Sequence, residues 1–178
     1  MSISIQPSNQ NLAQSSKFQL TFDRLPYVTF FCQTVGIPGL SIQPYAQDTL
    51  FVNLSVPGNK LTYETLDIKF LIDEDLMSWL SVHNWIRGMA FPESFEEYRN
   101  LPLLQRNPML NGATDKPQYS DASFTVYTNK NNPNYRVQFV DCFPISISGI
   151  EYNVENTADT ILTGSASFKF SYYNVNKL

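Results

Sequence analysis

The chain has few of the residues that most catalytic and metal sites need. Its 178 residues include a single histidine, two cysteines and seven glycines. The glycines form neither of the usual phosphate-binding motifs, and the cysteines and the histidine lack the spacing of metal ligands. We therefore expect no catalytic site, no metal site and no cofactor.

Charge is also scarce. Charged residues make up 16% of the chain, against a usual share of about 25%. The net charge is −4 and no run of Lys or Arg occurs, so specific binding to DNA or RNA, which requires neutralised phosphates, is not expected. Isolated proteins normally keep a charged surface, so the composition favours a subunit of an assembly. A well-packed β-sandwich with a polar, uncharged surface is the alternative.

Long hydrophobic runs and targeting signals are missing as well. No stretch approaches the roughly 20 apolar residues that span a bilayer, and residues 1–14 lack the cationic start and apolar middle of a signal peptide. We expect the chain to fold in a cytoplasm and not to insert into a membrane. Cys32 and Cys142 both fall in predicted strands, where buried free thiols are favoured over a disulfide.

Aromatic and alternating apolar residues are abundant, and aromatics alone reach 14%. The alternation predicts a mainly β fold, an antiparallel sandwich or barrel of about eight strands. These strands belong to one domain at 17–178. The polar residues 1–16 before it are expected to form a flexible N-terminal arm. The first two strands are expected to pair as a hairpin. The predicted strands cover residues 17–24, 27–35, 40–44, 49–56, 60–72 and 122–128. Residues 134–150 are predicted as two strands broken at Pro144, and a long last strand covers 160–175. A polar turn is expected between the third and the fourth.

One flanking helix is predicted over residues 73–87. Asp73 can cap it, and Glu74 and Asp75 lie in the first turn, where the helix dipole favours negative charge. Capping explains these carboxylates better than a glycosidase pair.

The helix carries an apolar stripe on one face. The stripe consists of Leu76, Trp79, Leu80, His83 and Ile86. A packed His83 is therefore favoured over a catalytic base. Trp79 and Trp85 are expected to be core or helix-packing residues, and an interface anchor is the alternative for Trp85, which lies off the stripe. The expected core residues are Phe70, Leu76, Trp79, Leu80, Phe139, Phe168 and Phe170.

Residues 89–121 form a proline-rich excursion with one short helical signal at 94–100. It holds too many apolar side chains for a merely solvated loop. These candidate partner-contact residues are Phe91, Phe95, Tyr98, Leu101, Leu103 and Leu104. Contact with another protein and a lid folded back on its own domain are both open.

Three parts of the sequence resemble the tail tube family of contractile-tailed phages, which includes major tail tube, tube terminator (completion) and baseplate tube-initiator proteins. Residues 56–64 (VPGNKLTYE) with 73–79 (DEDLMSW) are similar to the family's strand, acidic turn and helix. Residues 141–148 (DCFPISIS), with a last strand containing FSYY, resemble its C-terminal half. The early FFCQ and IPG segments are similar to its first strands and turn.

The resemblance implies a structural virion protein and not an enzyme. Six copies would form a ring of the tail tube whose sheets join into an inner barrel, through which DNA passes without specific binding. Its partners would be other tail tube, sheath, neck or baseplate proteins, with assembly in the host cytoplasm. The excursion at 89–121 is longer than expected in a major tail tube subunit, which favours a specialised end ring, a terminator or an initiator; the major subunit is the alternative.

A different class of function also fits the residues taken alone. Exposed Tyr and Trp side chains could stack on sugars, so a carbohydrate-binding β-sandwich module is the rival hypothesis.

Overall fold

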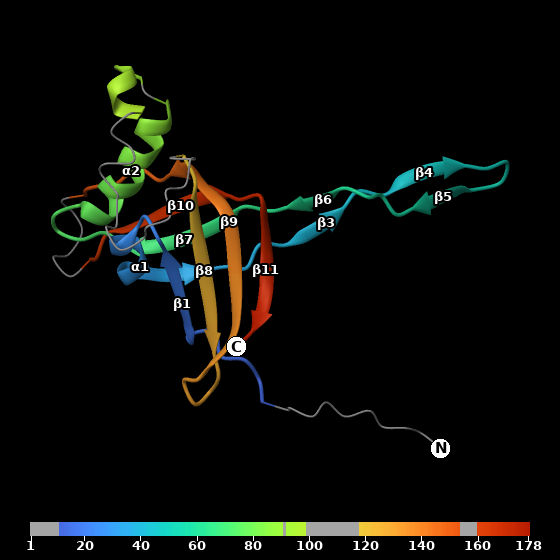
Figure 1. Cartoon of the computed structure of the whole chain (residues 1–178), viewed down its shortest axis with the longest axis horizontal. Helices are drawn as coiled ribbons and strands as arrows, with labels where there is room; N and C mark the ends of the chain where they lie inside the picture. Colours follow the sequence, from blue (N-terminus) through green and yellow to red (C-terminus); the bar gives the residue numbers. More distant parts are fainter. Residues whose placement is uncertain (1–10, 91, 99–117, 154–159) are drawn as a thin grey trace.

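The computed structural model describes residues 11–90, 92–98, 118–153 and 160–178 (Figure 1). Within these ranges the chain is mostly antiparallel β-structure, with eleven strands, two labelled helices and a short helical segment at 95–98. Two sheets form a sandwich-like body, and a narrow two-stranded arm projects from it (Figure 1). The mainly β, antiparallel fold predicted from the alternation is confirmed.

The first sheet, called sheet A below, has four strands, each antiparallel to its neighbour. Their order across the sheet is β1 (Phe18–Phe22), β8 (Ser120–Tyr127), the first part of β9 (Pro133–Ile147) and β11 (Tyr172–Lys177). One face is buried, because apolar residues alternate along the strands.

The second sheet, sheet B, contains the rest of β9, β10 (Thr163–Lys169), β7 (Leu66–Leu71) and β2 (Cys32–Val35). Strand β9 therefore belongs to both sheets and changes sheet near Asp141, which has a positive φ of 55°. Pro144 was predicted to break this strand, but β9 is continuous through it. Beyond Cys142, β9 pairs only with β10 in the described structure, so the missing N–H of Pro144 is tolerated at this edge.

The predicted last strand at 160–175 is two strands. β10 ends at Lys169, and after a corner β11 continues on sheet A, where the N–H of Ser171 donates to the carbonyl of Val140 at 3.0 Å. The apolar alternation runs through the corner without interruption, so the sequence gives no sign of it.

Aromatic side chains join the inner faces of the two sheets. Phe22 of sheet A lies 4.9 Å from Phe168 of sheet B between ring centroids, and Phe139 lies 5.0 Å from Phe170. Phe70, Phe139 and Phe168 are fully buried, and Phe170 is 8% exposed. The main hydrophobic core is therefore the space between the sheets.

Helix α2 covers Met77–Ala90 and not residues 73–87. Asp73 still caps it from outside, because its carboxylate accepts hydrogen bonds from the N–H groups of Met77 (3.0 Å) and Ser78 (2.8 Å). Partial burial would raise the pKa of Asp73, but these bonds and one from the Ser78 hydroxyl outweigh it and lower that pKa. No helix in the described ranges is long and apolar enough to cross a membrane.

The buried face of α2 differs from the predicted stripe. It consists of Ser78, Val82, Trp85 and Gly88. Trp85 is fully buried, whereas Trp79 is half-buried at the margin of the core and donates its indole N–H to the carbonyl of Ser148 at 2.9 Å. Leu76 and Leu80 are half-buried as well. Trp85 is therefore a core residue, in agreement with the first of its two predicted roles, and Trp79, predicted as core, lies at the margin of the core.

Helix α1 (Pro26–Phe31) replaces the first part of the strand predicted at 27–35. Pro26 suits the first turn of a helix, and the N–H of Thr29 donates to the carbonyl of Leu25 at 3.0 Å. The remaining residues form β2, which pairs with β7, while β1 pairs with β8. The predicted hairpin between the first two strands is wrong.

The arm is built from two short ribbons in succession. Near the body β3 (Leu40–Ile42) pairs with β6 (Leu61–Tyr63), and further out β4 (Tyr45–Asp48) pairs with β5 (Asn53–Val56). The predicted polar turn is strand β4, and the turn at the tip is Thr49–Val52, which was predicted as strand. The arm points away from the body, on the side opposite α2 (Figure 1).

Candidate assembly surfaces

The described residues hold no cluster of three or more His, Cys, Asp or Glu side chains placed to bind a metal. His83 stacks on Trp79, with ring centroids 4.9 Å apart. Both cysteines are free thiols, and burial raises the pKa of Cys32 to about 11 and that of Cys142 to about 12. Neither thiol is therefore suited to act as a nucleophile. The distinctive surfaces of the molecule are open strand edges and exposed apolar side chains.

Each ribbon of the arm has one apolar face. The register pairs Leu40 with Tyr63 and Ile42 with Leu61, and cross-strand partners lie on the same face. In the outer ribbon Tyr45 pairs with Val56 and Leu54 pairs with Gln47, which is a polar exception on this face. The opposite faces carry small or polar side chains, namely Ser41, Thr62, Ala46, Ser55, Asp48 and Asn53. The apolar faces remain accessible, since Ile42 is 53% and Tyr45 57% exposed.

The tip of the arm is the most exposed apolar part of the described chain. Leu50 is 95% and Phe51 96% exposed. Thr49 holds the turn, because its N–H donates to the carbonyl of Val52 at 3.3 Å and its hydroxyl oxygen accepts from the N–H of Val52 at 3.2 Å. An isolated two-stranded hairpin is marginally stable in water, so the arm gains little stability from its own strand pairing.

Gly58 allows the two strands of the arm to approach closely between the inner and the outer ribbon. A Cβ atom at this position would lie 2.2 Å from the backbone carbonyl oxygen of Gln43, a distance that real Cβ atoms do not reach. Gln43 is followed by Pro44, and Pro57 precedes Gly58, so both strands lack an N–H donor beside the crossing. The close approach fixes the path of the arm between its inner and outer ribbons.

Sheet A ends in two open edges. Within the described ranges, β1 pairs only with β8 and β11 pairs only with β9. Because the four strands alternate in direction, β1 and β11 run in opposite directions. A second copy placed beside the first in the same orientation would therefore bring β11 and β1 together as an antiparallel pair.

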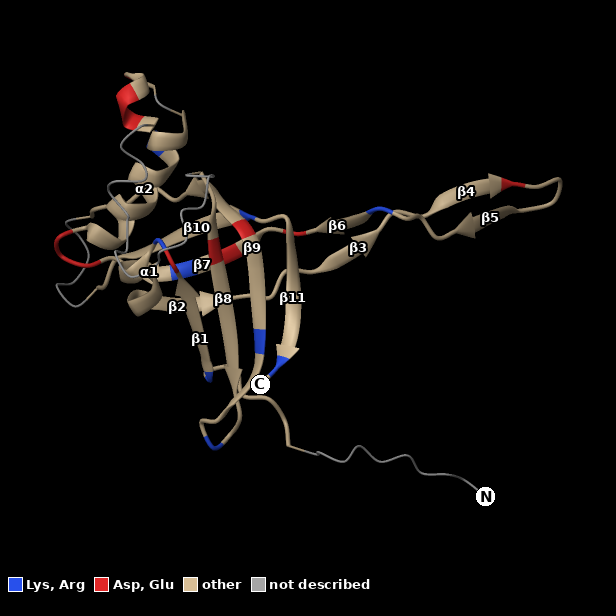
Figure 2. Ribbon diagram, in the orientation of Figure 1, with Lys and Arg blue, Asp and Glu red and all other residues tan. Residues whose placement is uncertain are grey.

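The outer face of sheet A is polar but almost uncharged. The register places two rows of four side chains across this face, Gln19–Thr125–Arg136–Asn176 and Thr21–Ser123–Gln138–Asn174. Arg136 is the single charged residue of the eight, and Figure 2 shows how sparse charge is along these strands. At the end of the face Asp23 lies near Asp121, and burial together with this neighbouring charge raises the pKa of Asp23.

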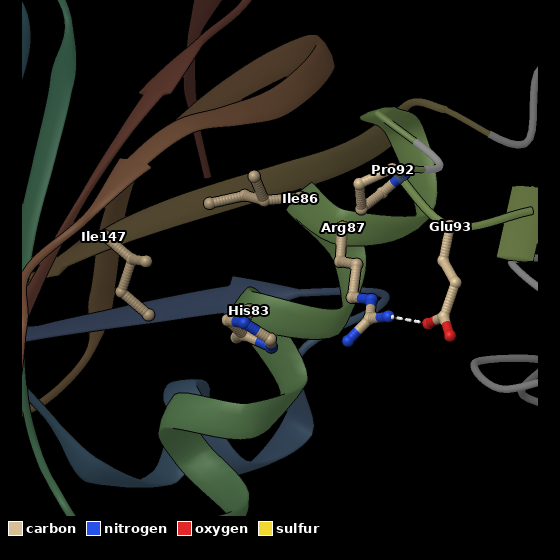
Figure 3. A pocket seen from close by; sticks show the side chains of 6 residues that line it. All are labelled: His83, Ile86, Arg87, Pro92, Glu93 and Ile147. Atoms are coloured by element: carbon tan, nitrogen blue, oxygen red, sulfur yellow. Dashed lines mark hydrogen bonds and ion pairs between the residues drawn. The ribbon is translucent and has the colours of Figure 1, made fainter.

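A shallow groove of about 520 Å³ lies beside α2 (Figure 3). Its apolar lining comes from Ile86 of α2, Pro92 after the helix and Ile147 at the end of β9, with His83 between them. Two further residues, Arg87 and Glu93, form an ion pair at the rim, and the Arg87 Nε also lies 2.6 Å from Glu97. The charges of the rim are therefore compensated within the same chain.

Two of the predicted partner-contact residues can be placed. Phe95 is 61% exposed and stacks on Tyr98 with centroids 5.6 Å apart, and the hydroxyl of Tyr98 accepts a hydrogen bond from the Gln118 side chain. The others, Phe91, Leu101, Leu103 and Leu104, lie outside the described residues, and so does most of the excursion.

The arm tip was missed at the sequence level. Its signal was available, because Leu50-Phe51-Val52 is an apolar run between the polar residues Asp48 and Asn53. Such a run at an exposed turn is unfavourable for a monomer and typical of a binding surface.

The chain is similar to several proteins of contractile tails. It is 22% identical over 157 residues to the tail tube terminator protein of Enterobacteria phage T4. The aligned region covers 84% of this chain and 78% of that protein. Its fold is similar to a chain in the tube-terminating cap of the anti-feeding prophage, with a TM-score of 0.59, 10% identity and full coverage of both chains. A chain of the six-fold symmetrised anti-feeding prophage baseplate gives a TM-score of 0.52 at 10% identity, covering 94% of this chain and 97% of that one.

The match to a family extends over nearly the whole sequence. Residues 2–176 match the phage tail tube protein family, in agreement with the resemblance seen in the sequence. Members of this family are structural parts of the tail, which accounts for open edges and exposed apolar surface in place of a catalytic centre. The chain belongs to the phage tail tube protein family and is a structural protein of the virion tail, not an enzyme.

Proposed function

We propose that this protein forms a hexameric ring that terminates a phage tail tube and lets DNA pass through its centre. The observation that carries the proposal is the pair of complementary open edges, β1 and β11, on sheet A. Open strand edges are an aggregation hazard in a monomer and are removed when a ring of copies closes.

Ring closure follows from the strand directions. Each copy supplies four alternating strands, so β11 of one copy meets β1 of the next as an antiparallel neighbour, and the pattern repeats around the ring. Six copies of four strands would form a barrel of 24 strands. The number six is supported by the six-fold symmetry of the baseplate whose chain has a similar fold.

The outer face of sheet A would line the channel. Its two rows present hydroxyl and amide groups with one charge in eight residues, and the whole chain carries a net charge of −4. Such a wall offers few cations to DNA phosphates and so gives little affinity for DNA. The duplex would pass without specific binding.

The position at the end of the tube is supported by the tail tube terminator of phage T4, the curated relative described above. Residues 17–178 would form the single tube-like domain after an N-terminal arm at 1–16. The excursion with Phe95 and Tyr98 would contact a sheath or neck protein that a repeating tube subunit does not meet. Assembly would take place in the host cytoplasm.

Native mass spectrometry of the full chain, alone and with short tail tubes, tests the proposal. We expect six-fold rings that bind tube ends and do not grow into long tubes. Long tubes formed by this chain alone would instead indicate a major tail tube subunit, and a monomer under both conditions would contradict a ring.

A variant at the open edge makes the test specific. The N–H of Leu178 donates to the carbonyl of Asn134, so by alternation Val175 directs its N–H away from β9. Val175→Pro removes this outward donor, and we expect a folded monomer. Val175→Ala is the matched control and should still form rings; rings of Val175→Pro with wild-type stability would argue against the β1–β11 contact.

A further inference from the structure

We infer that one end of the ring channel contacts the phosphate backbone of the passing DNA through Arg136 and Lys17 of every copy. The inference rests on the proposed ring and deepens it, because it names the part of the channel that touches DNA. The contact is electrostatic and independent of base sequence.

The charges of sheet A are segregated between its two ends. Residues 11–22, 122–140 and 172–178 hold no acidic residue, and their basic residues are Lys17, Lys130, Arg136 and Lys177. Three acidic residues lie towards the other end, Asp23 after β1, Asp121 at the start of β8 and Asp141 where β9 changes sheet. Arg24 also lies there, but its guanidinium packs over the Trp85 ring. In Figure 2 blue segments mark the end of sheet A with the β8–β9 turn, and red segments lie towards the opposite end.

Two of the four cations lie on the face that would line the channel. Arg136 is exposed and belongs to one of the two polar rows of that face. The N–H of Tyr127 donates to the carbonyl of Lys17 at 3.0 Å, so strand pairing continues to Lys17. Because Lys17 precedes Gln19 of the same row by two residues, it shares this face. Its ammonium donates to the carbonyl of Asn129 at 2.6 Å, which fixes it at the end with the turn.

The acidic residues of this face do not pair with Arg136. Arg136, Asp23 and Asp121 line the same depression of about 190 Å³, and the row with Ser123 and Gln138 lies between them. Among the described residues no ion pair involves Arg136. Its charge therefore remains available to an external anion.

Repetition in six copies would arrange these side chains as two hoops, a hoop being the six equivalent side chains at one level of the ring. The Arg136 hoop and the Lys17 hoop are two residues apart along the strands, at most about 7 Å. B-DNA carries one negative charge per about 1.7 Å of its axis, so roughly four phosphates lie within this span. Asp23 and Asp121 repel the same phosphates at the other end, which confines the contact to the end with the β8–β9 turn.

Such a contact is compatible with the passage of DNA. Four neutralised phosphates correspond to a slope of about −3 to −4 in a plot of log K against log salt concentration. The affinity would then fall by about 100-fold between 50 and 200 mM salt, so the duplex is held loosely and can slide.

Fluorescence anisotropy of a labelled linear duplex with preformed rings tests the contact. We expect binding at low salt that is equal for two unrelated sequences and has the slope given above. A closed circular duplex cannot enter a closed ring, so it should compete at least about 10-fold less well than linear DNA of the same length. Equal competition by the circle would place the binding outside the channel and overturn the inference.

Charge variants identify the side chain that carries the contact. Arg136→Gln removes one hoop, and we expect it to raise the dissociation constant at low salt by about 10- to 100-fold and to reduce the slope by about 2. Arg136→Lys keeps the charge and should stay within about 3-fold of the wild type. The matched control is Lys69→Gln, which changes the net charge equally at an exposed position on the outer face of sheet B and should also stay within about 3-fold.

The outcomes separate this contact from the ring, because native mass spectrometry reports whether each variant still forms rings. Rings for which Arg136→Gln and Lys69→Gln have equal effects, or which bind no duplex at low salt, would overturn the contact and leave the ring intact. Rings that bind polyglutamate more tightly than the duplex would assign the cationic end to an acidic protein and also overturn it. A wild-type chain that remains monomeric would overturn both proposals.

Discussion

The body and the arm use the same kinds of side chains in opposite surroundings. In the body Trp85, Phe139 and Phe168 are fully buried between the sheets and α2, whereas in the arm Leu50 and Phe51 are at least 95% exposed. Burial of apolar area stabilises the body as a monomer, and the arm gains no such stabilisation from its own chain. The comparison shows that the apolar side chains of the body are covered by their own chain, whereas those at the tip of the arm are not.

The largest effect should come from the largest fully buried side chain of the body. Trp85→Ala removes a fully buried indole that packs 6.2 Å from Phe168 and donates to the carbonyl of Gln118. We expect it to lower the free energy of unfolding by about 3–5 kcal/mol, measured by chemical denaturation.

Trp79→Ala is the matched control for this prediction. Trp79 lies on the same helix but is half-buried, so its truncation should cost roughly half as much. A larger loss for Trp79→Ala than for Trp85→Ala would contradict the observed orientation of α2.

The next effect should be confined to the arm. Gly58→Ala places a methyl group against the carbonyl of Gln43, and such overpacking costs about 1–3 kcal/mol locally. Because the arm strands pair only with each other among the described residues, the melting temperature of the body should not change, while amide exchange in β3–β6 becomes faster and ring formation weakens. Gly36→Ala, where a Cβ meets nothing within 4 Å, is the control.

A smaller effect is expected at the start of α2. Asp73→Ala removes the cap of Met77 and Ser78 and should cost about 1 kcal/mol at neutral pH. Since the pKa of Asp73 is lowered in the folded state, its contribution is present above the unfolded value near pH 4 and is lost as the pH falls through the folded value. The difference between wild type and Asp73→Asn, followed by denaturation from pH 7 to pH 2, should shrink over this acidic range. A difference that grows with acidity would contradict the lowered pKa.

The smallest effect on folding should come from the arm tip. Phe51→Ser exposes no new surface and should change the unfolding free energy by less than about 0.5 kcal/mol. Its consequence should appear only in assembly, measured as the yield of rings. A clear loss of monomer stability would show that the arm packs on its own body.

Several strands could be predicted because their environment is local in the sequence. In β7 and β10 one face is buried and the other exposed, so alternation of apolar and polar residues reports their structure directly. Asp73 could likewise be recognised as a helix cap, although the helix begins four residues later than expected.

The wrong predictions arose where one sequence pattern is compatible with two different structures. The expected face of α2 and its observed face, with Val82 and Trp85, are both apolar at helical spacing, and only packing against sheet B and α1 selects between them. Residues 27–31 have high β-propensity, yet Pro26 and burial of Val28 against the core favour a helix. Tertiary contacts outweigh propensity at these places.

By itself the sequence determined the mainly β class, the absence of familiar catalytic motifs and the similarity to tail tube proteins, because composition and alternation are properties of short segments. Only the tertiary structure decided that β9 joins two sheets, that β1 and β11 are left as antiparallel open edges, and that residues 40–63 leave the body as an arm. Strand pairing, open edges and exposure depend on which distant segments meet, and that information is not carried by any one segment.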